Sequence, residues 1–147
     1  NFKTLFYDPA VKKEEFGCKK IDSLPQLLKT SDIIVVAVHL NSKTKDMVNK
    51  SFFKHVKKKS FFINISRGEI IDESALINAI KSGIIQRASV DVIKNEQSNS
   101  IKSNRLYQFS KENSKLIITP HIAGLTYDSE EKALTYAFNE LKKHLKK

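Results

Sequence analysis

The stretch that decides the fold spans residues 61–72 and reads FFINISRGEIID. It opens as an apolar run with the length and β-branched content of a buried parallel strand. Polar residues interrupt this run from Asn64 onward, where such a strand should end. Gly68 then allows the backbone to turn, and Asp72 is placed to cap a helix over residues 73–82. The stretch therefore predicts a strand, a loop and a helix in an α/β fold.

Arg67 lies at the carboxyl end of this predicted strand. Ligands of open α/β sheets bind outside the carboxyl ends of the strands, so Arg67 is placed where a substrate would bind. A guanidinium at that position can hold a carboxylate through two parallel hydrogen bonds. A surface arginine in a strand-to-helix loop fits the same local pattern. Both interpretations stay open at this point.

The rest of the chain alternates apolar runs with segments of helical periodicity. The apolar runs predict strands over residues 3–7, 33–38, 84–92 and 116–118. Helical segments are predicted over residues 10–18, 44–49, 51–56 and 73–82, after Ser23, and after Thr126 or Ser129. Residues 97–114 are polar, and we expect a long loop there. Strands that alternate with helices predict a parallel sheet covered on both faces.

The composition describes one soluble globular domain. The chain has 147 residues, of which 40% are hydrophobic and 29% are charged. Its single cysteine, Cys18, cannot form an internal disulfide, and no apolar run is long enough to span a bilayer. These features predict a cytoplasmic protein without a membrane partner.

The formal net charge of +10 raises the possibility of a nucleic-acid partner. Lysines 57–59 and the lysines after residue 141 could form a phosphate-binding face. The basic residues are nevertheless scattered, and no aromatic residues are interleaved with them to stack on bases. A basic nucleic-acid-binding module is therefore the least favoured alternative.

Three predicted strands end in residues that can carry chemistry. Arg67 follows the first, Asp91 with Glu96 the second, and His121 the third. A cation, a carboxylate and an imidazole at one sheet edge suit the interconversion of a hydroxy acid and an oxo acid, provided that something accepts the hydride. Each residue also has a plain alternative: His121 as a loop histidine, Glu96 as a solvated acid, and Asp91 as a turn former.

The other histidines are weaker candidates. His39 follows a strand and could line the same cleft, whereas His55 and His144 belong to lysine-rich helical segments. No cluster of His, Cys, Asp or Glu residues has zinc-like spacing. The sequence therefore predicts no metal site.

Six motifs occur in a fixed order along the chain. They are Asp8-Pro9, Leu24 to Leu28 with Ser31-Asp32-Ile33, Ile63-Asn64 with Ser66-Arg67-Gly68, Asp72-Glu73 with Ala75-Leu76, Asp91-Val92, and Thr119-Pro120-His121-Ile122-Ala123-Gly124. This order resembles the NAD-dependent D-isomer-specific 2-hydroxyacid dehydrogenases, which include phosphoglycerate, lactate and glycerate dehydrogenases. The resemblance covers nearly the whole chain, and six ordered motifs are far more specific than any one of them.

The resemblance implies a Rossmann-type doubly wound parallel sheet with NAD as its cofactor. It also implies a 2-hydroxy acid or 2-oxo acid as substrate, and a homodimer. In that family Arg67 would bind the substrate carboxylate, His121 would be the general acid/base, and Glu96 would hydrogen-bond the histidine. Nicotinamide would carry the hydride that the residues alone do not supply.

The resemblance assigns four residues to the cofactor. Asp8, followed by Pro9, would bind the adenosine ribose hydroxyls. Asp91 would approach the nicotinamide carboxamide, and His121 would lie beside the same ring.

The chain departs from the family pattern in three places. Gln97 follows Glu96 where proline is usual, Ile93-Lys94 replaces an aromatic–acidic pair, and His39 stands where proline is common. The dinucleotide fingerprint should lie about 20 residues before the ribose acid, but only seven residues precede Asp8.

We therefore expect residues 1–147 to be a partial dinucleotide-binding domain with its C-terminal helix. The first strand and the phosphate loop would be absent, and the substrate domain would be mostly absent. On this interpretation the chain is a fragment of an oxidoreductase and is inactive alone. The alternative is a non-catalytic, NAD-sensing scaffold of the same fold, although a scaffold has no need of Arg67, Glu96 and His121 together.

Overall fold

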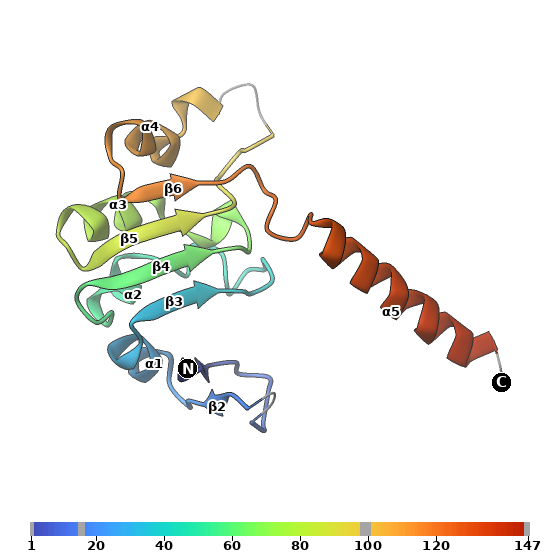
Figure 1. The fold of residues 1–147 in the computed structure, drawn as a ribbon. Coiled ribbons are helices and arrows are strands. Elements are labelled where there is room, and N and C mark those ends of the chain that lie inside the picture. Colours follow the sequence, from blue (N-terminus) through green and yellow to red (C-terminus); the bar gives the residue numbers. More distant parts are fainter. Residues whose placement is uncertain (1, 15–16, 98–100, 146–147) are drawn as a thin grey trace.

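A computed structural model describes residues 2–14, 17–97 and 101–145 of the chain. Its strands form two separate parallel sheets (Figure 1). The first sheet pairs β1 (Leu5–Phe6) with β2 (Lys19–Lys20). The second has the order β3 (Ile33–Val36), β4 (Ser60–Asn64), β5 (Ile85–Val90) and β6 (Leu116–Ile118). This parallel, Rossmann-like α/β architecture confirms the predicted fold class.

One face of the larger sheet is covered by the helices that connect the strands, which are α1 (Leu24–Thr30), α2 (Lys50–Lys54), α3 (Glu73–Lys81) and α4 (Arg105–Glu112) (Figure 1). Helix α5 (Tyr127–Leu145) follows the last strand. Two short 3₁₀ turns are η1 (Gly68–Ile70) and η2 (Ile101–Ser103). Helices α3 and α4 pack on β5 and β6, whereas α5 extends away from the sheet (Figure 1). Of the helices in the described part of the chain, none has both the length and the hydropathy to cross a bilayer.

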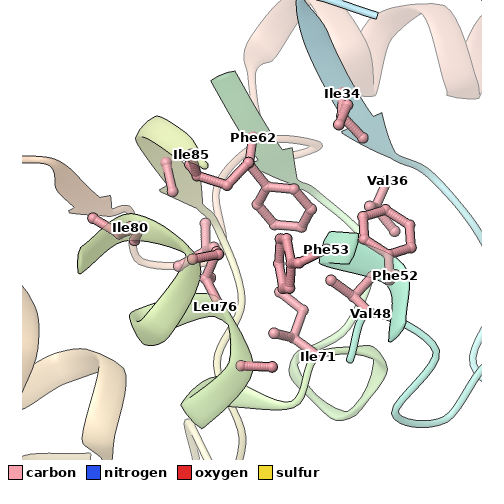
Figure 2. Close-up of a cluster of buried hydrophobic side chains, with 14 of the residues drawn as sticks. Ile34, Val36, Val48, Phe52, Phe53, Phe62, Ile71, Leu76, Ile80 and Ile85 are labelled. Carbon is pink, nitrogen blue, oxygen red and sulfur yellow. The ribbon is translucent and has the colours of Figure 1, made fainter. Parts of the chain in front are cut away.

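Phe62 of β4 lies at the centre of the core and is fully buried. Its ring meets those of Phe52 and Phe53 edge to face, at centroid distances of 6.4 and 5.9 Å (Figure 2). Such pairs stabilise a core beyond the burial of their area, and losing a buried phenylalanine costs about 3–5 kcal/mol. The core therefore fixes β4, and with it the loop that follows β4.

The helix after β4 begins and ends as the sequence predicts. The Asp72 carboxylate accepts hydrogen bonds from the backbone N–H groups of Ser74 and Ala75, which caps α3. Gly83 follows the helix with φ +73°, a conformation that glycine adopts without steric cost.

Two predicted helical segments are wrong in the described residues. Residues 10–14 are irregular, and residues 17–20 turn into β2. Residues 44–49 belong to a turn and bridge, because the Thr44 hydroxyl donates to His39 O and accepts from Asn41 N–H. These side-chain bonds favour a compact turn over a helix.

The predicted loop over 97–114 is also wrong, in part. Residues 98–100 lie outside the described ranges, but η2 and α4 fill residues 101–112. The Asn104 side chain caps α4 by accepting from Tyr107 N–H. Leu106, the second residue of the helix, is buried in the core. Burial of one apolar side chain stabilises a helix whose other residues are mostly polar.

The larger sheet has an uncovered edge, and the prediction that both of its faces are covered is wrong in the described residues, because one face is open (Figure 1). Within the described ranges, β1 of the smaller sheet and β3 of the larger sheet each pair with a strand on one side only. In the doubly wound order a central strand lies between these two positions. Ile33, Val35 and Ile117 remain exposed on the face opposite α3.

Candidate active site

Buried polar groups fix the loop that presents Arg67. Asn64 is fully buried at the end of β4, where its Oδ1 accepts from Ser66 N–H and its Nδ2 donates to Arg67 O. The Ser66 hydroxyl donates to Val36 O and accepts from Val38 N–H, which ties the loop to β3. Because these buried polar groups are satisfied, the loop holds one conformation.

The backbone of Gly68 packs directly against the loop after β5. A Cβ atom at this position would lie 2.1 Å from the carbonyl carbon of Ile93 and 2.4 Å from Lys94 N. No side chain fits there, so only glycine allows the Arg67 loop and the Glu96 loop to approach this closely.

Asp91 holds the segment after β6. Its buried carboxylate accepts from the Thr119 hydroxyl and from the N–H groups of Ile122 and Ala123, at 3.0 and 2.8 Å for the two backbone bonds. Burial raises the pKa of Asp91, but these three hydrogen bonds and the neighbouring His121 outweigh it, so the pKa lies below its usual value. Asp91 is therefore an ionised anchor for residues 119–123.

His121 has a constrained backbone within this segment. Its φ is +55°, and its N–H donates to Asp91 O at 2.9 Å. Residues other than glycine seldom adopt such a φ, and they do so most often where the surrounding structure requires it. The imidazole Nδ1 lies 2.6 Å from Oε1 of Glu96, whose Oε2 accepts from Ile93 N–H at 3.4 Å.

One hollow brings Arg67, Glu96 and His121 together. It has a volume of ≈ 580 Å³ and is lined by Arg67, Gly68, Glu69, Ile93, Asn95, Glu96, Gln97 and His121. This size suits a small organic ligand. The Arg67 Nη1 donates to Ser66 O at 2.6 Å. This bond uses one of the five N–H donors of the guanidinium group. The hollow thus combines an anion-binding cation with a carboxylate–imidazole pair.

The remaining predicted residues lie apart from this hollow. Asp8 follows β1, is half-buried, and accepts from Ala10 N–H at 2.7 Å, with Pro9 between them. His39 lines a neighbouring hollow with Leu40 and Arg67. In the part of the chain that the structure describes, no group of three or more His, Cys, Asp or Glu side chains is arranged to hold a metal ion.

Sequence reasoning missed the supporting roles of Asn64, Thr119 and Gly68. Asn64 interrupts an apolar run, which is a signal of a buried polar group with a structural duty. The contact of Gly68 with Ile93 joins residues distant in sequence, and no local pattern indicates it.

Residues 1–123 match the D-isomer specific 2-hydroxyacid dehydrogenase, NAD binding domain family. The chain belongs to this family. NAD is the cofactor of the family, and the Rossmann-like fold of the dehydrogenase domain agrees with it.

Individual relatives show how much of a dehydrogenase the chain represents. It is 32% identical to D-3-phosphoglycerate dehydrogenase of Methanocaldococcus jannaschii over 95% of the chain and 26% of that protein. It is 34% identical to glyoxylate reductase of Pyrococcus furiosus over 89% of the chain and 38% of that protein. The chain therefore spans about a quarter to two-fifths of the length of these dehydrogenases.

A solved dehydrogenase shares the fold. The structure of D-lactate dehydrogenase from Aquifex aeolicus, in complex with NAD and lactic acid, superposes with a TM-score of 0.75 at 30% identity. The match covers 98% of this chain and 46% of that one.

Proposed function

We propose that this chain supplies the proton-transfer and carboxylate-binding groups of an NAD-dependent D-2-hydroxyacid dehydrogenase. The proposed reaction interconverts a 2-oxo acid and a D-2-hydroxy acid. The observation that carries the proposal is the Glu96–His121 pair facing Arg67 across one hollow. Arg67 carries the positive charge that complements a substrate carboxylate, and the Glu96–His121 pair can supply a proton to the oxo group.

Arg67 binds the substrate carboxylate. Its guanidinium presents a planar set of donors, so two of them can hold both carboxylate oxygens and fix the orientation of the neighbouring carbonyl. Oriented binding of this kind is worth several orders of magnitude in rate.

His121 moves the proton. In reduction the imidazolium donates a proton to the carbonyl oxygen, and in oxidation the neutral imidazole takes it back from the hydroxyl. Glu96 Oε1 lies against Nδ1, so Nε2 is the nitrogen left for the substrate. The ionised Glu96 carboxylate stabilises the imidazolium and holds the ring in place.

The dinucleotide supplies or accepts the hydride when it is bound. Asp8 at the end of β1 can accept from ribose hydroxyls, because its half-buried carboxylate has one oxygen beyond that bonded to Ala10 N–H. Asp91 and His121 are proposed to flank the nicotinamide. The four glycines of the chain make no Gly-x-Gly-x-x-Gly pattern. The residues of this chain are therefore proposed to contact the adenosine ribose and the nicotinamide, and they include no glycine-rich phosphate loop.

A chimera tests this proposal. We would replace the matching segment of the Pyrococcus furiosus glyoxylate reductase with this chain and measure NADH oxidation with glyoxylate and larger 2-oxo acids. The expected result is reduction that is abolished by His121→Ala, with the unaltered relative as control. A folded chimera that binds NADH but reduces no 2-oxo acid would contradict the proposal.

A further inference from the structure

The loop that carries Glu96 is held from outside the hollow by two polar side chains. Glu73, in the first turn of α3, accepts through Oε1 from Lys94 N–H at 3.3 Å. The same oxygen accepts from Asn104 Nδ2 at 2.7 Å, and this Nδ2 also donates to Lys94 O at 3.1 Å. Glu73 and Asn104 thus engage both polar groups of the Lys94 backbone.

This arrangement is not needed to begin either helix. Asp72 already caps α3 through two backbone N–H groups, and the Asn104 Oδ1 caps α4 through Tyr107 N–H. The Glu73 carboxylate and the Asn104 amide nitrogen are instead directed to a loop 21 and 10 residues away in sequence.

Lys94 adds a further tether. Its Nζ lies 2.6 Å from Oδ1 of Asp46, a residue held at φ +50° in the turn after β3. On the opposite side, Gly68 leaves no space between its backbone and Ile93. Glu96 comes two residues after Lys94, so the position of the Lys94 backbone decides where the Glu96 carboxylate lies.

We propose that Glu73 is a positioning residue that holds the Glu96 loop so that the Glu96 carboxylate meets His121. This role rests on the proposed function, and Glu73 touches neither substrate nor imidazole. It acts through the Lys94 backbone and is assisted by Asn104. Loss of its carboxylate would loosen the loop and reduce the time that Glu96 spends on the ring.

The readout is the hydrogen bond at His121 Nδ1 in the 147-residue chain, followed by the chemical shift of that nitrogen in NMR at one fixed pH. The charged groups around this imidazole are Glu96 at Nδ1, Asp91 beside its backbone, Arg67 and Glu69 in the same hollow, and Lys111 in the adjoining hollow. Loss of the carboxylate from Nδ1 changes the shift of this nitrogen, because the nitrogen then lacks its charged hydrogen-bond partner. Glu96→Gln replaces that charged partner by a neutral one and sets the scale of the change.

Glu73→Ala is expected to move the Nδ1 signal in the same direction as Glu96→Gln and by a smaller amount. Glu73→Gln keeps an acceptor oxygen and should stay near the wild-type value. Asn104→Ser keeps an α4 cap without the amide donors, so it should move the signal even if Glu73→Ala folds poorly. Ser60→Ala removes two hydrogen bonds of a buried hydroxyl at the start of β4, away from the hollow, and is the control for lost stability, with no change at His121.

Two negative results have different meanings. Wild-type Nδ1 signals in both Glu73→Ala and Asn104→Ser, with a changed signal in Glu96→Gln, overturn the positioning role and leave the proposed function intact. An unchanged Nδ1 signal in Glu96→Gln overturns the Glu96–His121 pairing of the proposed function, and the positioning role of Glu73 is overturned with it.

Discussion

Glu96 Oε1 lies 2.6 Å from His121 Nδ1, although 25 residues separate the two in the chain. Glu96 follows β5 and His121 follows β6, and β5 and β6 are neighbours in the sheet. Because the strands are parallel, both loops leave the same edge, and Arg67 leaves that edge from β4. The order of the strands therefore assembles the site.

Arg67→Lys should reduce kcat/KM of the glyoxylate reductase chimera by about 10²-fold. Lysine keeps the charge, but its ammonium cannot make two parallel bonds to a carboxylate, so the oxo acid would be poorly oriented. Steady-state kinetics with saturating NADH measure this. Arg87→Lys, at an exposed position on β5, is the matched control and should be neutral. Equal kcat/KM in the two variants would remove Arg67 from the site.

Gly68→Ala should lower the free energy of unfolding of the 147-residue chain by about 1–3 kcal/mol. The added methyl group meets backbone atoms of Ile93 and Lys94, which cannot move aside as a flexible side chain would. Urea denaturation measures the effect. Gly124→Ala is the control, because nothing lies within 4 Å of a Cβ there. Equal stability of the two variants would mean that the loops are not in this close contact.

Asp91→Asn should destabilise the chain by about 1–3 kcal/mol at neutral pH. One of the three donors to Asp91 would then face an amide N–H₂ group. The pKa of Asp91 is lowered in the folded state, so its stabilisation is present above the unfolded-state value of 3.8 and is lost as pH falls through the folded-state value.

The difference in stability between wild type and Asp91→Asn should therefore shrink as the pH falls below about 4. Urea unfolding over a range of pH values tests this sign. A difference that stays constant or grows in acid would show that Asp91 is not an ionised anchor.

Local sequence patterns predict the strands of the larger sheet and α3 well, since apolar runs, the Asp72 cap and Gly83 are local signals. They miss β2, whose two residues are both lysines. They also place Arg67, Glu96 and His121 at strand ends, and a parallel sheet then brings these ends together. They fail for α4, because one buried side chain, Leu106, stabilises a helix of polar composition. They fail for 44–49 because side-chain bonds to Asn41 and His39 close a turn there.

The contacts that align the site could not be predicted from the sequence. The approach of Gly68 to Ile93 and the bond from Lys94 N–H to Glu73 both join residues more than 20 positions apart. Such contacts depend on how the folded chain packs, and the periodicity of hydrophobic residues along the sequence does not reveal them.

The most direct test of the proposed proton transfer is kcat/KM for glyoxylate reduction by the chimera with Glu96→Gln. Glutamine keeps the shape of Glu96 without its charge, so the His121 ring loses the carboxylate that lies 2.6 Å from Nδ1. Reduction needs His121 as an oriented proton donor, so we expect kcat/KM to fall by about 10²-fold. A kcat/KM equal to that of the wild-type chimera would contradict the proposed proton transfer.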